Sequence, residues 1–112
     1  MKIVDWNTLP ELGLSHNQHI KKKTLVSKGE IPHLMMFGTA VFKPGDKVDF
    51  HLHEIMFEVF FIQIGKVIFE VNGEKHILTK GKCIIIEPGE LHAQSNPFDE
   101  DVSWSYFGIS ID

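Results

Sequence analysis

The chain has 112 residues, and its 11 basic residues, all lysines, are set against 15 acidic residues, for a formal net charge of −4. The length predicts a single domain, and 43% hydrophobic residues, among them nine phenylalanines, are enough to build a packed core. A largely disordered chain is therefore excluded. Nucleic-acid binding is disfavoured, because phosphate and base contacts call for a basic surface and usually for arginine.

The single cysteine, Cys83, has no partner for an internal disulfide. It lies in an apolar run, which predicts a buried thiol. No apolar run approaches the roughly 20 residues that a membrane-spanning helix needs, and the first residues do not resemble a signal peptide. These features predict a cytoplasmic protein that does not bind a membrane.

Residues 1–32 are predicted to form an N-terminal arm with one or two short strands, near 2–6 and 24–27. The arm holds scattered apolar residues and the run Lys21-Lys22-Lys23. In an acidic chain this run is interpreted as a solvated turn.

Residues 33–112 are predicted to form a β-barrel in which strand follows strand. The expected strands cover 33–42, 48–53, 57–64, 66–71, 74–79, 82–87, 91–95 and 102–111. Turn signals recur roughly every 8–12 residues, which is typical of an all-β sandwich or barrel. Asn72-Gly73 is the strongest of these signals and predicts a hairpin with a type I′ turn.

Three histidines and one glutamate could form a metal site. His51 and His53 are two residues apart on a predicted strand, so their side chains share one face. Glu58 has the opposite parity, and a bend at 54–56 would return the chain so that Glu58 faces them from a neighbouring strand. His92 follows the Pro88-Gly89 turn. Imidazoles with a carboxylate suit one divalent transition metal, such as Fe, Mn, Ni, Zn or Cu; the alternative is a chance His-x-His pattern.

The spacing of these residues resembles the two sequence motifs of the cupin superfamily over about residues 36–111. The residues that match are Gly45, His51, His53, Glu58 and Gly65 for the first motif, and Gly81, Gly89, His92 and Asn96 for the second. One departure is Pro88, which stands one position later than the proline of the second motif. The resemblance implies a double-stranded β-helix (jelly-roll) cupin barrel in which His51, His53, Glu58 and His92 hold one metal ion.

Four further side chains are candidates for binding a small-molecule ligand beside the metal. They are Gln94, Phe60, Ile62 and Tyr106. Gln94 shares the parity of His92, and Phe60 and Ile62 share that of Glu58, although core packing would also explain these two. Whether Trp104 and Tyr106 face the pocket is left open. Asp49 is a further candidate by parity, and the other four histidines, His16, His19, His33 and His76, are interpreted as surface residues.

If the metal ligands point into the barrel, the residues that alternate with them point outward. On two neighbouring strands these are Phe50, Leu52, Val59 and Phe61. A monomer rarely exposes so many large apolar side chains in one place. We therefore expect the N-terminal arm or a second subunit to cover them, and similar cupin barrels favour a homodimer.

The leading functional hypothesis is a small metal-dependent enzyme, an oxygenase, isomerase or lyase, that acts on a small organic metabolite. The alternative is a non-catalytic module that binds a small molecule or a sugar in the same pocket. The lack of arginine and of an obvious proton-transfer residue favours this alternative. A purely structural protein is a third reading, and the fold alone does not choose among them.

Overall fold

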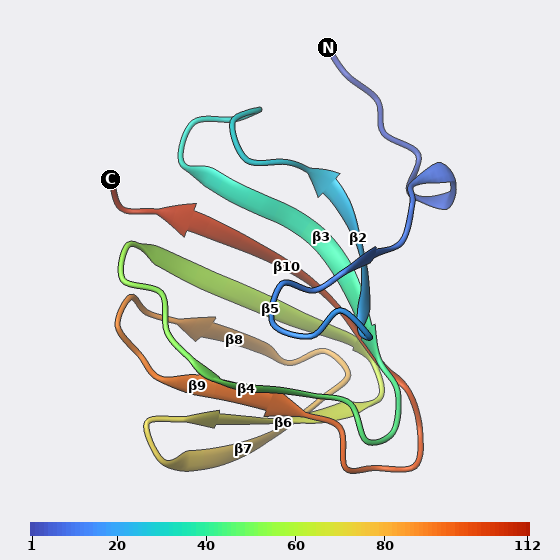
Figure 1. The fold of residues 1–112 in the computed structure, drawn as a ribbon, viewed down its shortest axis with the longest axis vertical. Coiled ribbons are helices and arrows are strands. Elements are labelled where there is room, and N and C mark those ends of the chain that lie inside the picture. Colours follow the sequence, from blue (N-terminus) through green and yellow to red (C-terminus); the bar gives the residue numbers. More distant parts are fainter.

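The computed structural model describes residues 1–112 as two antiparallel sheets that face each other (Figure 1). A short 3₁₀ helix, η1, precedes the strands at Trp6–Thr8. The strands are β1 (Leu12–Gly13), β2 (Lys21–Val26), β3 (Leu34–Phe42), β4 (Lys47–His51), β5 (Met56–Ile64), β6 (Lys66–Val71), β7 (Glu74–Thr79), β8 (Cys83–Ile86), β9 (His92–Ser95) and β10 (Val102–Ser110). No helix in the structure has the length and apolar character needed to cross a membrane.

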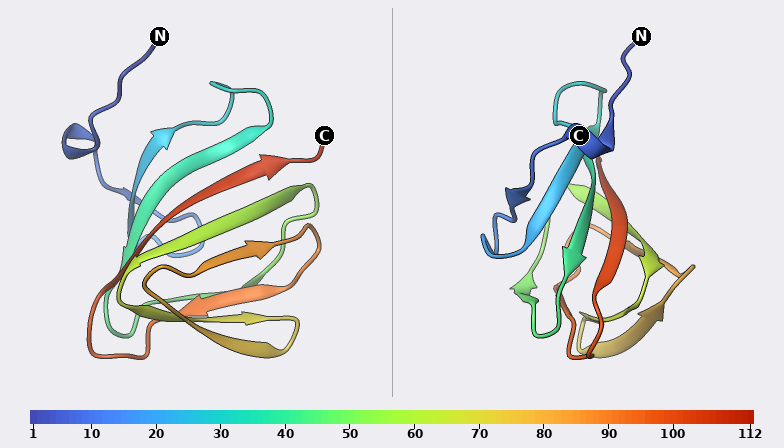
Figure 2. Two further views of the ribbon diagram at one scale, coloured as in Figure 1. Left: turned by 180° about the vertical axis from the view of Figure 1, so that it is seen from behind. Right: turned by 90° about the vertical axis from the view of Figure 1, so that its right-hand side faces the viewer.

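The strand order is that of a jelly roll. The larger sheet has the order β1-β2-β3-β10-β5-β8, and the smaller sheet has the order β4-β9-β6-β7. The chain crosses between the sheets after β3, β4, β5, β7, β8 and β9, so most strands pair with partners that are distant in sequence, and Figure 2 shows the two sheets curving around a common interior. The predicted all-β jelly-roll barrel is confirmed.

Aromatic side chains from both sheets fill the interior. The ring centroids of Phe42 and Trp104 lie 4.5 Å apart, and those of Phe60 and Phe69 lie 5.0 Å apart. All four are buried, and they belong to one continuous core of twelve buried residues. These aromatic contacts join the two sheets, because Phe69 belongs to β6 of the smaller sheet and the other three belong to the larger sheet.

The strands after residue 33 begin and end within two residues of the predicted ranges. Two positive φ angles, 49° at Asn72 and 85° at Gly73, give the β6–β7 hairpin the left-handed pair of residues that a type I′ turn requires. The predicted hairpin is confirmed.

Two predictions for the N-terminal arm are wrong. Residues 2–6 form no strand, and Lys21-Lys22-Lys23 is not a turn but the first half of β2. Lys22 is hydrogen-bonded into the larger sheet opposite Leu12 on one side and Ala40 on the other. Pairing with β1 and β3 outweighs the weak strand preference of lysine.

The N-terminal segment packs on the outer face of the larger sheet beside β3. The indole Nε1 of Trp6 donates a hydrogen bond to Thr39 Oγ1 at 2.7 Å, and Lys23 Nζ lies 3.9 Å from the centroid of the indole ring. The segment thus covers one end of this face. It leaves Phe61 and Ile85, on β5 and β8, exposed.

Two predictions about outward-facing residues also need correction. Cys83 is exposed, because it pairs with Phe61 across β8 and β5 and shares its outward face. Phe50 and Phe61 do not form one patch, because β4 and β5 belong to different sheets. Parity gives the side of a strand on which a residue lies, but it does not reveal which sheet the strand joins.

Candidate metal centre

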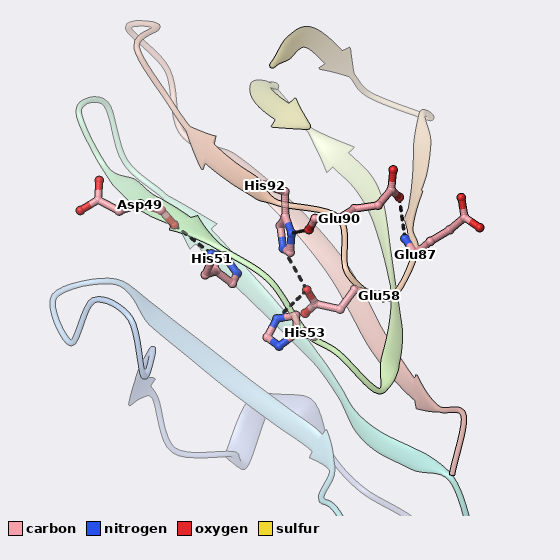
Figure 3. A network of polar contacts seen from close by, with 7 residues as sticks. All are labelled: Asp49, His51, His53, Glu58, Glu87, Glu90 and His92. Atoms are coloured by element: carbon pink, nitrogen blue, oxygen red, sulfur yellow. Dashed lines mark hydrogen bonds and ion pairs between the residues drawn. The ribbon is translucent and has the colours of Figure 1, made fainter. Parts of the chain in front are cut away.

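Three strands and one connection bring the four predicted ligands together (Figure 3). His51, at the end of β4, pairs with His92, at the start of β9, in the smaller sheet. Glu58 lies on β5 of the larger sheet and faces them across the barrel. His53 lies just beyond β4, in the connection to β5. Glu58 was expected on a neighbouring strand, and it comes instead from the opposite sheet.

The ligand atoms converge on one point. The potential donor atoms of His51, His53, Glu58 and His92 all lie within 4.8 Å of one another. Oε1 of Glu58 is 3.1 Å from His53 Nε2 and 3.3 Å from His92 Nε2. Glu58 and His92 are buried, whereas His51 and His53 are half-buried, so the cluster opens on the side of His51 and His53.

Backbone carbonyls orient two of the imidazoles. Nδ1 of His51 lies 2.8 Å from the carbonyl oxygen of Asp49, and Nδ1 of His92 lies 2.9 Å from that of Glu90. A carbonyl oxygen only accepts, so each Nδ1 carries the proton of these bonds. In the neutral rings Nε2 is then left with a lone pair directed toward the cluster, which is the usual arrangement of metal-binding histidines.

The turn before β9 is fixed by hydrogen bonds on both sides. The backbone N–H of Gly89 donates to the carbonyl of His53 at 2.7 Å, which ties the turn to the β4–β5 connection. The carboxylate of Glu90 accepts from the N–H of Glu87 at 2.8 Å (Figure 3). It also accepts from the side-chain amide of Asn72 at 2.9 Å. These contacts hold the carbonyl that orients His92.

The electrostatics of the cluster favour an ionised Glu58. Burial raises the pKa of this carboxyl, but the contacts with His53 and His92 outweigh it and lower the pKa to about 2. The carboxylate of Glu58, whose Oε1 is 3.1 Å from His53 Nε2, raises the pKa of His53, against the effect of burial. Burial, reinforced by the charges of His92, His16 and His53, lowers the pKa of His51.

The buried atoms of the cluster fit a cation. Glu58 Oε1 and His92 Nε2 are fully buried and neither has a hydrogen-bond partner, although they face each other. When His92 is neutral these atoms are two acceptors, and their lone pairs repel each other. A cation between them would satisfy both, and three imidazole nitrogens with one carboxylate suit a divalent transition metal.

A cavity of about 350 Å³ adjoins the cluster. Three of the four predicted binding residues line it, namely Gln94, Phe60 and Tyr106, and Trp104 also lines it. Ile62 is fully buried in the core and does not line the cavity. The Oε1 atom of Gln94 is buried without a hydrogen-bond partner. Burial, together with the charge of Glu58, raises the pKa of Tyr106 to about 12, so its hydroxyl keeps its proton at neutral pH.

His16 is the residue of the site that sequence reasoning missed. It lies in the loop between β1 and β2 and lines the cavity, with its ring centroid 4.3 Å from that of His51. Its side chain is exposed, as predicted for a surface residue, but nothing in the sequence indicated that it borders the cavity, because it has no ligand spacing to any other histidine. Asp49, by contrast, directs its exposed side chain away from the cluster and contributes only its carbonyl (Figure 3).

Comparison with known proteins agrees with the fold and the motifs. The family model of the Cupin domain matches residues 38–111. The chain therefore belongs to the cupin family.

The names of some similar proteins refer to oxalate. The chain is 29% identical over 69 residues to an oxalate-binding protein of Thermotoga maritima, a match that covers 62% of this chain and 57% of that protein. The crystal structure of a predicted oxalate decarboxylase from Thermotoga maritima superposes with a TM-score of 0.88 at 23% identity, over 97% of this chain and 99% of that one. A Cupin 2 conserved barrel domain protein from Salinispora arenicola superposes with a TM-score of 0.73 at 17% identity, over 98% and 87%.

Proposed function

We propose that the chain binds one divalent transition metal through His51, His53, Glu58 and His92, and that the metal binds a small carboxylate of the oxalate class. The observation that carries the proposal is the pair of buried acceptors, Glu58 Oε1 and His92 Nε2, that face each other at 3.3 Å. Four protein ligands leave two positions free on a six-coordinate ion, and a chelating carboxylate can occupy both.

The cavity and the relatives support a carboxylate ligand. The acids and bases that line the cavity comprise two lysines, three histidines and a single carboxylate, Glu58, which is itself a proposed metal ligand. A bound divalent ion would make the cavity positive within a chain of negative net charge. The name of the oxalate-binding relative agrees with this chemistry.

Metal content is the first test, and His53→Ala is the informative variant. Wild-type protein grown with Mn, Fe, Ni and Zn should carry close to one divalent ion per chain by elemental analysis. Loss of the His53 imidazole should weaken metal binding by at least about tenfold, the lower bound for losing even an outer-shell partner. The barrel should stay folded, because His53 lies outside the core and water can take its place. His76→Ala, a variant of an exposed histidine on β7, should bind metal like the wild type.

Oxalate binding is the second test. Isothermal titration calorimetry should detect oxalate binding to the manganese-loaded protein and none after chelation of the metal. A wild type that retains no metal, or a His53→Ala variant that retains as much as the wild type, would contradict the metal site. Equal oxalate binding with and without metal would contradict chelation.

A metal-dependent enzyme that acts on a small metabolite is the second candidate. It is favoured by Tyr106 and Gln94, which line the cavity beside Glu58 and offer a hydroxyl donor and an unpartnered amide oxygen. Such groups can orient a bound molecule without taking a coordination position. A metal ion would supply Lewis-acid polarisation of the bound carboxylate. Carbon-13 oxalate incubated with the metal-loaded protein would give new NMR signals from an enzyme and an unchanged spectrum from a binding module.

We also propose that two copies of the chain form a homodimer. The support is the exposed apolar surface that the N-terminal segment leaves on β5 and β8. Light scattering of the wild type and of surface variants tests this proposal.

A further inference from the structure

Lys22 directs its side chain into the barrel, although both neighbouring lysines point elsewhere. It pairs with Ala40 on β3, and Ala40 pairs with Trp104 on β10. Both partners are buried in the core, and residues opposite each other in a sheet share a face. The next residue, Lys23, lies on the outer face over Trp6, as strand alternation requires. Lys22 accordingly lines the cavity of the metal centre.

The ammonium group of Lys22 has no partner in the protein. Nζ of Lys21 donates to the carbonyl of Gln18 at 3.1 Å, and Nζ of Lys23 donates to that of Trp6 at 3.1 Å. Lys22 makes neither a side-chain hydrogen bond nor an ion pair, although it is half-buried. Its Nζ is not a buried atom, so it can pair with an anion that enters the cavity. Glu58, the single carboxylate that lines the cavity, contacts His53 and His92 instead.

Lys22 and the metal ligands lie at different depths of the cavity. Lys22 and three other residues lie side by side on neighbouring strands of the larger sheet. Going across the sheet from Lys22, they are Ala40, Trp104 and Ile62. Glu58 lies four residues before Ile62 on β5, a separation of about 13 Å along a strand. The lysine stem can extend along the cavity. Oxalate, whose carboxylates are directly bonded, is much shorter than this separation along the strand.

We propose that Lys22 binds the second carboxylate of a dicarboxylate whose first carboxylate is bound at the metal centre, so that Lys22 selects ligands with several carbons between the two groups. This inference rests on the proposed function, because it needs the metal to hold the first carboxylate. It adds a specificity residue that the cupin motifs do not contain. A lysine that merely extends along the wall to solvent is the competing reading.

Lys22→Met tests the inference, because methionine keeps an unbranched side chain and removes the charge. Lys21→Met is the matched control, since it removes the same charge from the adjacent position of β2, where the side chain is exposed. The probes are glutarate, which has two separated carboxylates, valerate, which replaces one of them by a methyl group, and oxalate. Binding to the manganese-loaded proteins is measured by isothermal titration calorimetry, after metal content and circular dichroism have verified each variant.

We expect Lys22→Met to weaken glutarate binding by about tenfold, as for the loss of one charge-assisted contact, and to change valerate and oxalate binding by less than about threefold. Lys21→Met should leave all three unchanged. The inference is overturned if Lys22→Met affects glutarate and oxalate equally, if Lys21→Met has the same effect, or if the wild type binds oxalate but not glutarate. Wild-type protein that carries metal but binds no carboxylate overturns the proposed function as well.

Discussion

Glu58 is a residue whose ionised form the protein strongly favours. It is buried among histidines, and its pKa falls from the ordinary value of 4.5 to about 2. Between about pH 2 and pH 4.5, Glu58 binds fewer protons in the folded metal-free chain than in the unfolded chain. Lowering the pH through this range therefore destabilises the fold. The contribution of Glu58 is complete above pH 4.5 and is lost as the pH falls through its folded pKa.

Urea unfolding of the metal-free protein at pH 5, 4 and 3 should therefore show a falling free energy of unfolding. At about 1.4 kcal/mol per pH unit, the full contribution of Glu58 is on the order of 3 kcal/mol. Glu58→Gln should flatten this dependence, because the amide does not titrate. Glu11→Gln, a variant of an exposed carboxylate, should keep the slope of the wild type. Equal slopes for wild type and Glu58→Gln would contradict the assigned pKa.

The four clustered ligands were predictable because local patterns determine them. The spacing of His51 and His53 is that of residues on one face of a strand, and His92 follows the Pro88-Gly89 turn. The bend before Glu58 contains no glycine or proline and was inferred from the position of Glu58 relative to the two histidines. His16 and Lys22 were not predictable in this way. They reach the cavity through the pairing of β1 with β2 and of β2 with β3, and no local sequence pattern shows that β2 joins β3.

Asn96 illustrates a motif residue that supports the barrel without touching the metal cluster. Its side-chain amide donates to the carbonyls of Phe42 at 3.0 Å and Glu100 at 2.8 Å, and its oxygen accepts from the N–H of Phe98 at 3.1 Å. The backbone N–H of Gly45 donates to its carbonyl at 2.7 Å. The two sequence motifs thus meet in space at Gly45 and Asn96.

Among the connecting elements, the turn from β5 to β6 is the tightest. Gly65 has a φ of 81°, and a β-carbon at this position would overlap the backbone carbonyl of Asp101. Gly81 has a similar φ of 89° but open space around it. Substituting both glycines therefore distinguishes the cost of a left-handed backbone from the cost of a collision with the carbonyl of Asp101.

Gly65→Ala should destabilise the fold more than Gly81→Ala does. The left-handed conformation costs each alanine roughly 1–2 kcal/mol, and the collision with backbone adds to this only at Gly65. Urea unfolding of the two variants beside the wild type measures the difference. Equal losses of unfolding free energy would mean that the turn relaxes and that the close approach to Asp101 is unimportant.

Strand positions were easier to predict than strand partners. Turn signals bounded β6 and β7 correctly. Only the second half of β2 was predicted, near 24–27, because three lysines suggest solvent and the neighbours of β2 in the sheet are not visible in the sequence. The assignment of β4 and β5 to different sheets was equally hidden. It corrected both the direction from which Glu58 approaches and the supposed patch of Phe50 and Phe61.

For the whole molecule, Phe50 and Phe61 mark two different surfaces on which a homodimer could form, because they lie on different sheets. Phe61 and Ile85 are 45% and 62% exposed on the outer face of the larger sheet, whereas Phe50 is 52% exposed on β4 of the smaller sheet. The N-terminal segment packs beside β3 and covers none of them. A stable interface buries about 800 Å² per partner, so it needs a broad face rather than one side chain. The face around Phe61 and Ile85 also includes the exposed Cys83 and Ile109.

We expect light scattering to give twice the chain mass of 12.8 kDa for the wild type. The double variant Phe61→Glu, Ile85→Glu should be monomeric, because it would bury two unpaired carboxylates in the apolar centre of the interface. Phe50→Glu adds charge at an equally exposed phenylalanine of the other sheet and should remain dimeric. A dimer that survives the double variant but dissociates with Phe50→Glu would place the interface on the smaller sheet, and a monomeric wild type would contradict the dimer. Metal content separates dissociation from unfolding, because the ligand cluster lies inside each barrel and should survive in a folded monomer.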